Sequence, residues 1–160
     1  MKVIKIIDGT TVDGPGFRTS IYFAGCHHHC PGCHNPSTWD MANGEDMSIE
    51  ELTKRVVLNN MPVTFSGGDP LYQCSDLLQL AKAVKERGIN IWCYTGFTYD
   101  EIIANPAYNK LLDYMDVIVD GPYIESLRDT SLLFRGSKNQ RLIDVRKSTS
   151  DNITEWTSDF

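Results

Sequence analysis

Short apolar, β-rich runs alternate with helical patterns along this chain. The runs cover residues 18–24, 62–66, 89–94 and 116–120, and the last three begin 27 residues apart, which fits repeated units of one strand and one helix. This alternation predicts an α/β fold with a mostly parallel sheet. With 160 residues, of which 41% are apolar, the chain is long enough for one core and short for two.

Three helices are expected between these strands. Residues 48–51 and 98–101 both match a capping box, in which a Ser or Thr stands three residues before a Glu. The first of these helices must end before Pro62, and Pro106 limits the second to about two turns. A further helix is expected within residues 75–88, where a glycine closes an amphipathic run.

Glycine and polar residues follow each predicted strand. In a parallel α/β sheet or barrel, the loops at the carboxyl ends of the strands share one face, and that face holds the active site. We therefore expect four loops to converge, and they begin at Gly25, Ser66, Thr95 and Asp120.

Composition argues against several classes of partner. The net charge of −6 is spread along the chain without a Lys/Arg cluster, so nucleic-acid binding is not expected. No apolar run approaches the roughly 20 residues that a membrane span needs, and the N-terminus lacks a signal-peptide core. The expectation is a cytoplasmic protein that binds neither nucleic acid nor membrane.

Three of the five cysteines, Cys26, Cys30 and Cys33, fall within eight residues. This spacing suits metal ligation in a reducing compartment better than a disulfide framework. Three thiolates can hold three irons of a [4Fe–4S] cluster, and the missing fourth ligand would leave one iron open to a substrate. Cys74 and Cys93 stand apart beside apolar residues and are expected to be inert core thiols.

A Cys₃His zinc site is the alternative for this loop, because all four histidines lie beside the three cysteines. Structural zinc usually joins two separated ligand pairs, which favours the cluster. We expect His27, His28 and His29 to be solvated or shielding residues, whereas His34 could line a cofactor pocket. A non-catalytic metal-binding or electron-transfer module remains the alternative from another functional class.

The CxxxCxxC loop is followed by His34-Asn35-Pro36 and preceded by Asp13-Gly14-Pro15-Gly16-Phe17-Arg18. Together these motifs resemble the activating enzymes of glycyl-radical enzymes, which are radical S-adenosylmethionine (SAM) proteins. The resemblance implies one [4Fe–4S] cluster held by Cys26, Cys30 and Cys33, with SAM on the open iron. Reductive cleavage of SAM then yields methionine and a 5′-deoxyadenosyl radical.

The resemblance also implies contacts to SAM. Ser66-Gly67-Gly68-Asp69 is similar to the superfamily's Gly-Gly-Glu motif, with Asp in place of Glu. Gly67, Gly68 and Asp69 would hold the methionyl amino group, and Ser66 belongs to the same cofactor-binding segment. An aromatic residue often precedes the last cysteine, but Gly32 occupies that place here. Adenine contacts would then rest on the backbone from Gly32 to Cys33 and on His34. Arg18 and Arg135 are candidates for the methionyl carboxylate from charge alone.

Three later motifs narrow the resemblance: Tyr94-Thr95-Gly96, Val119-Asp120-Gly121 and residues 135–141, which read RGSKNQR. With the short length, they resemble the activating proteins of anaerobic (class III) ribonucleotide reductase, over residues 3–145. The implied partners are the large subunit of that reductase and an electron donor such as a flavodoxin or ferredoxin. An activase of another glycyl-radical enzyme, such as pyruvate formate-lyase, is the alternative.

The chain is short for a closed eight-unit barrel, so the resemblance implies a partial, open (β/α) barrel of the radical SAM type. We expect residues 1–146 to form this radical SAM domain. Residues 147–160 read as a polar C-terminal tail, either frayed or disordered until the partner docks.

Overall fold

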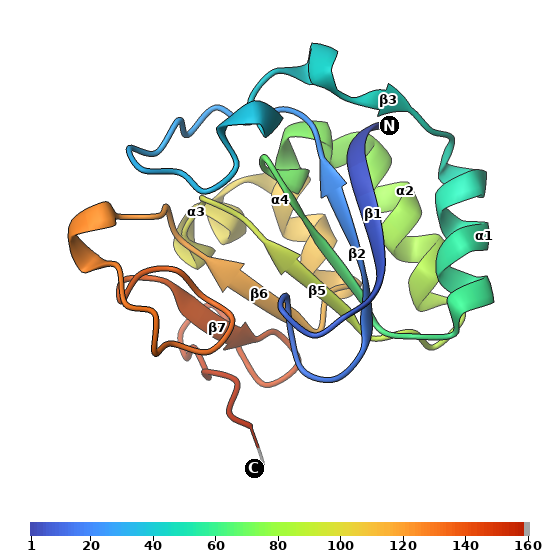
Figure 1. The fold of residues 1–160 in the computed structure, drawn as a ribbon. Coiled ribbons are helices and arrows are strands. Elements are labelled where there is room, and N and C mark those ends of the chain that lie inside the picture. Colours follow the sequence, from blue (N-terminus) through green and yellow to red (C-terminus); the bar gives the residue numbers. More distant parts are fainter. Residues whose placement is uncertain (159–160) are drawn as a thin grey trace.

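A computed structural model describes residues 1–158 of the chain. It has an α/β fold around one seven-stranded sheet in the order β3-β1-β2-β4-β5-β6-β7 (Figure 1). The strands are β1 (Lys2–Thr10), β2 (Arg18–Phe23), β3 (Glu45–Asp46), β4 (Val63–Gly67), β5 (Ile91–Tyr94), β6 (Val117–Asp120) and β7 (Arg141–Asp144).

The predicted parallel sheet is confirmed at its centre, where β2, β4, β5 and β6 run parallel to one another. At the edges, β1 pairs antiparallel with both β2 and β3, and β7 pairs antiparallel with β6. Within residues 1–158, β3 and β7 do not pair with each other, so the sheet is open.

The helices begin and end close to the residues that the sequence predicts. They are α1 (Ile49–Asn59), α2 (Cys74–Lys85), α3 (Tyr99–Ala104) and α4 (Pro106–Asn109), with short 3₁₀ segments at Pro36–Thr38, Met41–Asn43, Pro70–Gln73, Lys110–Asp113 and Glu125–Leu127. Both capping boxes form, at the starts of α1 and α3. None of these helices, over the part of the chain described, is long and apolar enough to cross a membrane.

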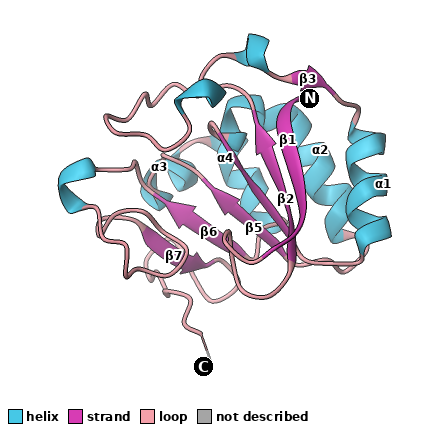
Figure 2. Ribbon diagram, in the orientation of Figure 1, coloured by secondary structure: helices cyan, strands magenta, loops and turns pink. Residues whose placement is uncertain are grey.

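The two faces of the sheet have different roles. The helices lie on one face (Figure 2), where their apolar side chains pack against alternate strand residues such as Phe65, Cys93 and Ile118 to form the main core. On the opposite face, Trp92, Val117, Val119 and Leu142 form a smaller apolar cluster. No helix among the described residues contributes to that second cluster, so this face carries the loops.

The C-terminal segment, predicted from sequence only as a polar tail, packs onto β7 as far as the structure describes it. Glu155 forms a bridge with Ile143, and the Trp156 N–H donates a 2.6 Å hydrogen bond to the Leu142 carbonyl. The Trp156 ring lies 5.0 Å from the Trp92 ring, centroid to centroid, in the smaller apolar cluster. Residues 159 and 160 of the predicted tail lie outside the described residues.

The carboxyl end of β4 presses directly onto the end of β2. A Cβ atom on Gly67 would overlap the backbone nitrogen and oxygen of Phe23, and one on Gly68 would overlap the carbonyl oxygen of Gly25. Two backbone hydrogen bonds stabilise this contact. The Gly68 N–H donates to the Phe23 carbonyl at 2.9 Å, and the Asp69 N–H donates to the Gly25 carbonyl at 2.8 Å. The two glycines therefore fix where the chain leaves β2.

Gly67→Ala should destabilise the fold by more than about 3 kcal/mol, because it combines backbone strain with a clash against another strand. Gly9→Ala is the matched control, since Gly9 also has a positive φ of 74° but open space around its Cβ position. The control should cost only about 1 kcal/mol. Urea unfolding of the two variants measures the difference, and equal costs would contradict the role given to Gly67.

Candidate functional site

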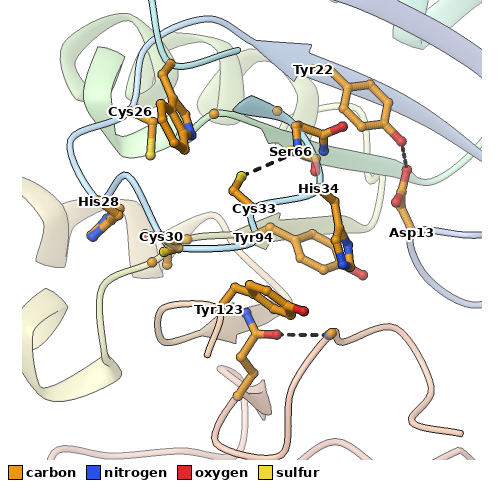
Figure 3. A pocket seen from close by; sticks show the side chains of 18 of the residues that line it. Asp13, Tyr22, Cys26, His28, Cys30, Cys33, His34, Ser66, Tyr94 and Tyr123 are labelled. Carbon is orange, nitrogen blue, oxygen red and sulfur yellow. Dashed lines mark hydrogen bonds between the residues drawn. The ribbon is translucent and has the colours of Figure 1, made fainter. Parts of the chain in front are cut away.

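The four predicted loops do converge at the carboxyl ends of the parallel strands. They surround a cavity of about 380 Å³ (Figure 3). Its lining includes residues from the loop after β2, the ends of β4 and β5, the loop after β6 and the β1–β2 hairpin, namely Asp13, Tyr22, Cys26, His28, Cys30, Cys33, His34, Trp39, Ser66, Gly67, Gly68, Tyr94, Thr95, Gly96, Gly121, Tyr123, Gly136 and Gln140. One cavity thus joins most of the motifs found in the sequence.

All three clustered cysteines line this cavity, as predicted. The loop turns tightly between the last two, where the Cys33 N–H donates a 3.0 Å hydrogen bond to the Cys30 carbonyl and Gly32 takes a φ of 74°. Cys26 is 8% exposed, and burial raises the pKa of its thiol. The five cysteines all lie within the described residues, and each is a free thiol.

The residues around the thiols fit an iron–sulfur cluster. Trp39 lies beside Cys26, whose backbone N–H donates a 3.1 Å hydrogen bond to the Trp39 carbonyl. The buried Trp39 Nε1 has no hydrogen-bond partner among residues 1–158, although its side chain lines the same cavity. A cluster would bring sulfur acceptors to this donor. Among residues 1–158, no three His, Cys, Asp or Glu side chains are arranged to bind one single metal ion.

The Ser66–Asp69 motif divides into two parts. Ser66, Gly67 and Gly68 line the cavity, whereas Asp69 is 2% exposed and lies beneath it. The Asp69 carboxylate accepts hydrogen bonds from the Leu71 N–H, the Thr95 hydroxyl and the Gly96 N–H, at 2.9 to 3.0 Å. The Asp69 side chain is therefore already occupied by protein donors.

The four histidines have different surroundings. His28 Nε2 lies 2.8 Å from the Asp69 carboxylate, and this hydrogen bond is the main cause that raises the pKa of His28. His27 and His29 are exposed, as expected, and lie against Tyr72 and Trp39. The ring of His34 lies in the cavity lining with its centroid 4.9 Å from that of Tyr123.

Sequence reasoning missed a group of polar side chains on the face of the sheet that the helices do not cover. The Tyr22 hydroxyl donates a hydrogen bond to the Asp13 carboxylate at the cavity wall (Figure 3). The Lys5 ammonium lies 4.6 Å from the centre of the Tyr22 ring. Asp13 belongs to the Asp-Gly-Pro-Gly motif, but its pairing with Tyr22 depends on the packing of the β1–β2 hairpin.

Neither arginine suggested for the methionyl carboxylate lines the cavity in the described structure. Arg18 begins β2, at the opposite end from the cysteine loop, and is bonded to Thr64 at 2.7 Å and Asn90 at 3.0 Å. Burial lowers the pKa of Arg18 to about 10. Arg135 donates a 2.9 Å hydrogen bond to the Gln140 carbonyl. Both arginines hold the fold together.

The later motifs build the cavity's far wall. The buried Asp120 carboxylate pairs with Arg141 at 2.6 Å and accepts the Tyr99 N–H at 2.8 Å. The Gln140 side chain donates to the Gly121 carbonyl at 3.0 Å and accepts the Gly136 N–H at 2.9 Å. Residues 119–121 and 135–141 therefore form one hydrogen-bonded unit.

Comparison with known proteins agrees with this geometry. A family model described as a 4Fe-4S single cluster domain matches residues 12–143. The anaerobic ribonucleoside-triphosphate reductase-activating protein of Escherichia coli K12 is 38% identical over 146 residues, covering 84% of this chain and 93% of its own length.

Proteins of the same name in Vibrio cholerae and in phage T4 are 39% and 38% identical. The Vibrio alignment covers 81% of this chain and 88% of the relative, and the phage alignment covers 82% and 86%. The family model spans both the cysteine loop and the later motifs. The chain belongs to the family of anaerobic ribonucleoside-triphosphate reductase-activating proteins, and it contains a 4Fe-4S single cluster domain.

Proposed function

We propose that this chain cleaves SAM reductively at a [4Fe–4S] cluster and so generates the glycyl radical on anaerobic ribonucleotide reductase. The observation that carries the proposal is the cavity that joins three free thiols to the Ser66–Gly68 backbone. Three cysteines leave one iron of the cluster without a protein ligand. In this chemistry, one electron splits the sulfonium into methionine and a 5′-deoxyadenosyl radical, which takes a hydrogen atom from the glycine.

The size of the cavity is compatible with a small-molecule ligand such as SAM. Its volume of about 380 Å³ falls in the range of small-molecule sites, roughly 300–1,000 Å³. The methionyl amino group would bind the open iron and donate hydrogen bonds to the backbone carbonyls of the Ser66–Gly68 segment. Adenine would lie by the backbone from Gly32 to Cys33 and by His34, whose ring already stacks on Tyr123.

The open sheet supports a partial (β/α) barrel of the radical SAM type. Its parallel strands β2, β4, β5 and β6 are joined through α1, α2 and α3, with the cavity at their carboxyl ends. An open side leaves room for a protein substrate, and two side chains of the β1–β2 hairpin suit contact with one. Val12, at the cavity, is 74% exposed and Phe17 is 66% exposed.

The relatives' names support the choice of protein partner. These name the anaerobic reductase as the protein activated, which favours it over another glycyl-radical enzyme as the partner. The electron would come from a donor such as a flavodoxin or ferredoxin, and the protein would act in the cytoplasm. The family model favours a cluster over the alternative of structural zinc.

Anaerobic reconstitution with iron and sulfide, followed by reduction with SAM, should yield 5′-deoxyadenosine and a glycyl radical on the cognate reductase. Cys26→Ala, Cys30→Ala and Cys33→Ala should reduce both products to background, because each removes an iron ligand. Cys74→Ala is the matched control and should keep both activities, since this thiol lies outside the cavity. Bound zinc, or an intact cluster that forms no 5′-deoxyadenosine, would refute the proposal.

Phe17→Ser should weaken binding to the reductase about tenfold, because truncating an exposed aromatic anchor at an interface costs more than about 1 kcal/mol. SAM cleavage without the reductase should not change. Leu58→Ser is the matched control, because Leu58 is 74% exposed but lies on α1, away from the cavity. Titration of the reductase measures the effect, and equal weakening by both variants would exclude Phe17 as a contact.

A further inference from the structure

His28 inserts into a slot formed by the ends of two strands. The side chain projects from the cysteine loop, between two of the thiols, and retains only 19% of its exposure. Its ring Nε2 lies 2.8 Å from the buried Asp69 carboxylate that follows β4. An ionised carboxylate only accepts hydrogen bonds, so the ring nitrogen donates. The ring also meets Phe97 edge to face, with centroids 4.6 Å apart.

The third wall of the slot is Gly96, in the loop after β5. If this residue carried a Cβ, the three nearest atoms would all belong to the His28 ring, with Cγ at 2.6 Å. The φ of Gly96 is not in the left-handed region, unlike that of Gly67. The backbone conformation of Gly96 therefore does not require glycine. The nearest group that a side chain at this position would meet is the His28 imidazole.

Asp69 connects the slot to both strands. Its carboxylate accepts the Gly96 N–H at 3.0 Å and the Thr95 hydroxyl at 2.9 Å, and it accepts the His28 ring nitrogen on the same oxygen. Its other oxygen caps the 3₁₀ turn at Leu71. One buried charge thus joins the cysteine loop, the end of β4 and the end of β5.

We propose that His28 is a positioning residue, which locks the cysteine loop onto the ends of β4 and β5 by filling the slot between Asp69, Gly96 and Phe97. The lock sets where Cys26 and Cys30 hold their irons relative to the Ser66–Gly68 backbone. It also gives the Asp69 carboxylate a role other than binding the methionyl amino group. Residues that orient metal ligands in this way typically change metal affinity about 10- to 100-fold when they are replaced.

The proposal rests on the cluster of the proposed function but not on SAM cleavage, so the test uses the reconstituted protein before SAM is added. Iron release to a chelator and the EPR line shape of the reduced cluster are the two readouts. His28→Ala should release iron about tenfold faster and broaden the spectrum. His27→Ala, the exposed neighbour in the same loop, should stay within about twofold of the wild type.

Gly96→Ala tests the slot from its other side. The added methyl group should expel the His28 ring and reproduce the iron release of His28→Ala, because the ring is what it would overlap. The double variant should match either single one, since both remove the same interaction. Thermal unfolding of the cluster-free chains should stay close to wild type, which separates loss of the lock from loss of the fold.

Two results would overturn the role of His28. One is a His28→Ala variant that releases iron no faster than His27→Ala. The other is a double variant whose two effects multiply to about 100-fold, which would show that Gly96 acts independently of the imidazole. A wild-type protein that keeps its cluster but makes no 5′-deoxyadenosine would count against the proposed function and would leave this role intact.

Discussion

The structure depends on the close contact between the end of β4 and the start of the cysteine loop. Gly67 and Gly68 have no side chains, and this lets the backbone of residues 23–25 lie directly on them. Two backbone hydrogen bonds seal the contact. Gly67 and Gly68 also line the cavity. A single steric requirement therefore both anchors the loop that carries the thiols and places a bare backbone beside them.

The two faces of the sheet serve different purposes: one packs the main core, and the other carries the candidate site. Helices bury the main core on one face, whereas the opposite face carries the hairpin and loops that enclose the cavity. Several motif residues act by holding these loops in place. Asp120 binds Arg141, Gln140 bridges residues 121 and 136, and Asp69 joins the ends of β4 and β5. A preorganised wall of this kind suits the proposed reaction, in which a radical intermediate would have to be kept away from water.

Much of the fold could be predicted because its signals are local. The capping boxes before α1 and α3 and the four parallel strands follow from short stretches of sequence. The antiparallel strands β1, β3 and β7 were missed, since residues 2–10 read KVIKIIDGT without a regular alternation of polar and apolar side chains and β3 and β7 are only two and four residues long. The docking of Trp156 on Trp92 joins residues far apart in the chain, so no local pattern indicates it.

The candidate site divides in the same way. The cysteine spacing alone predicts that the three thiols lie together on one tight loop. The pairing of His28 with Asp69 could not be predicted, because it depends on how the loop folds back over two strands. The Gly-Gly-Asp pattern is compatible with a carboxylate that faces a ligand, but the Thr95 and Gly96 donors occupy it from below. Sequence thus indicates which residue types gather, and packing decides which of them face the cavity.

Under the proposed function, three cysteines leave one iron of the cluster open for SAM beside the Ser66–Gly68 backbone. Electron–nuclear double resonance can detect this arrangement in the reduced, cluster-loaded protein, with SAM that carries ¹⁵N in its methionyl amino group. We expect hyperfine coupling between the cluster and this nitrogen. Saturating SAM that binds without any such coupling would rule this arrangement out, because the methionyl amino group would then not be a ligand of the open iron.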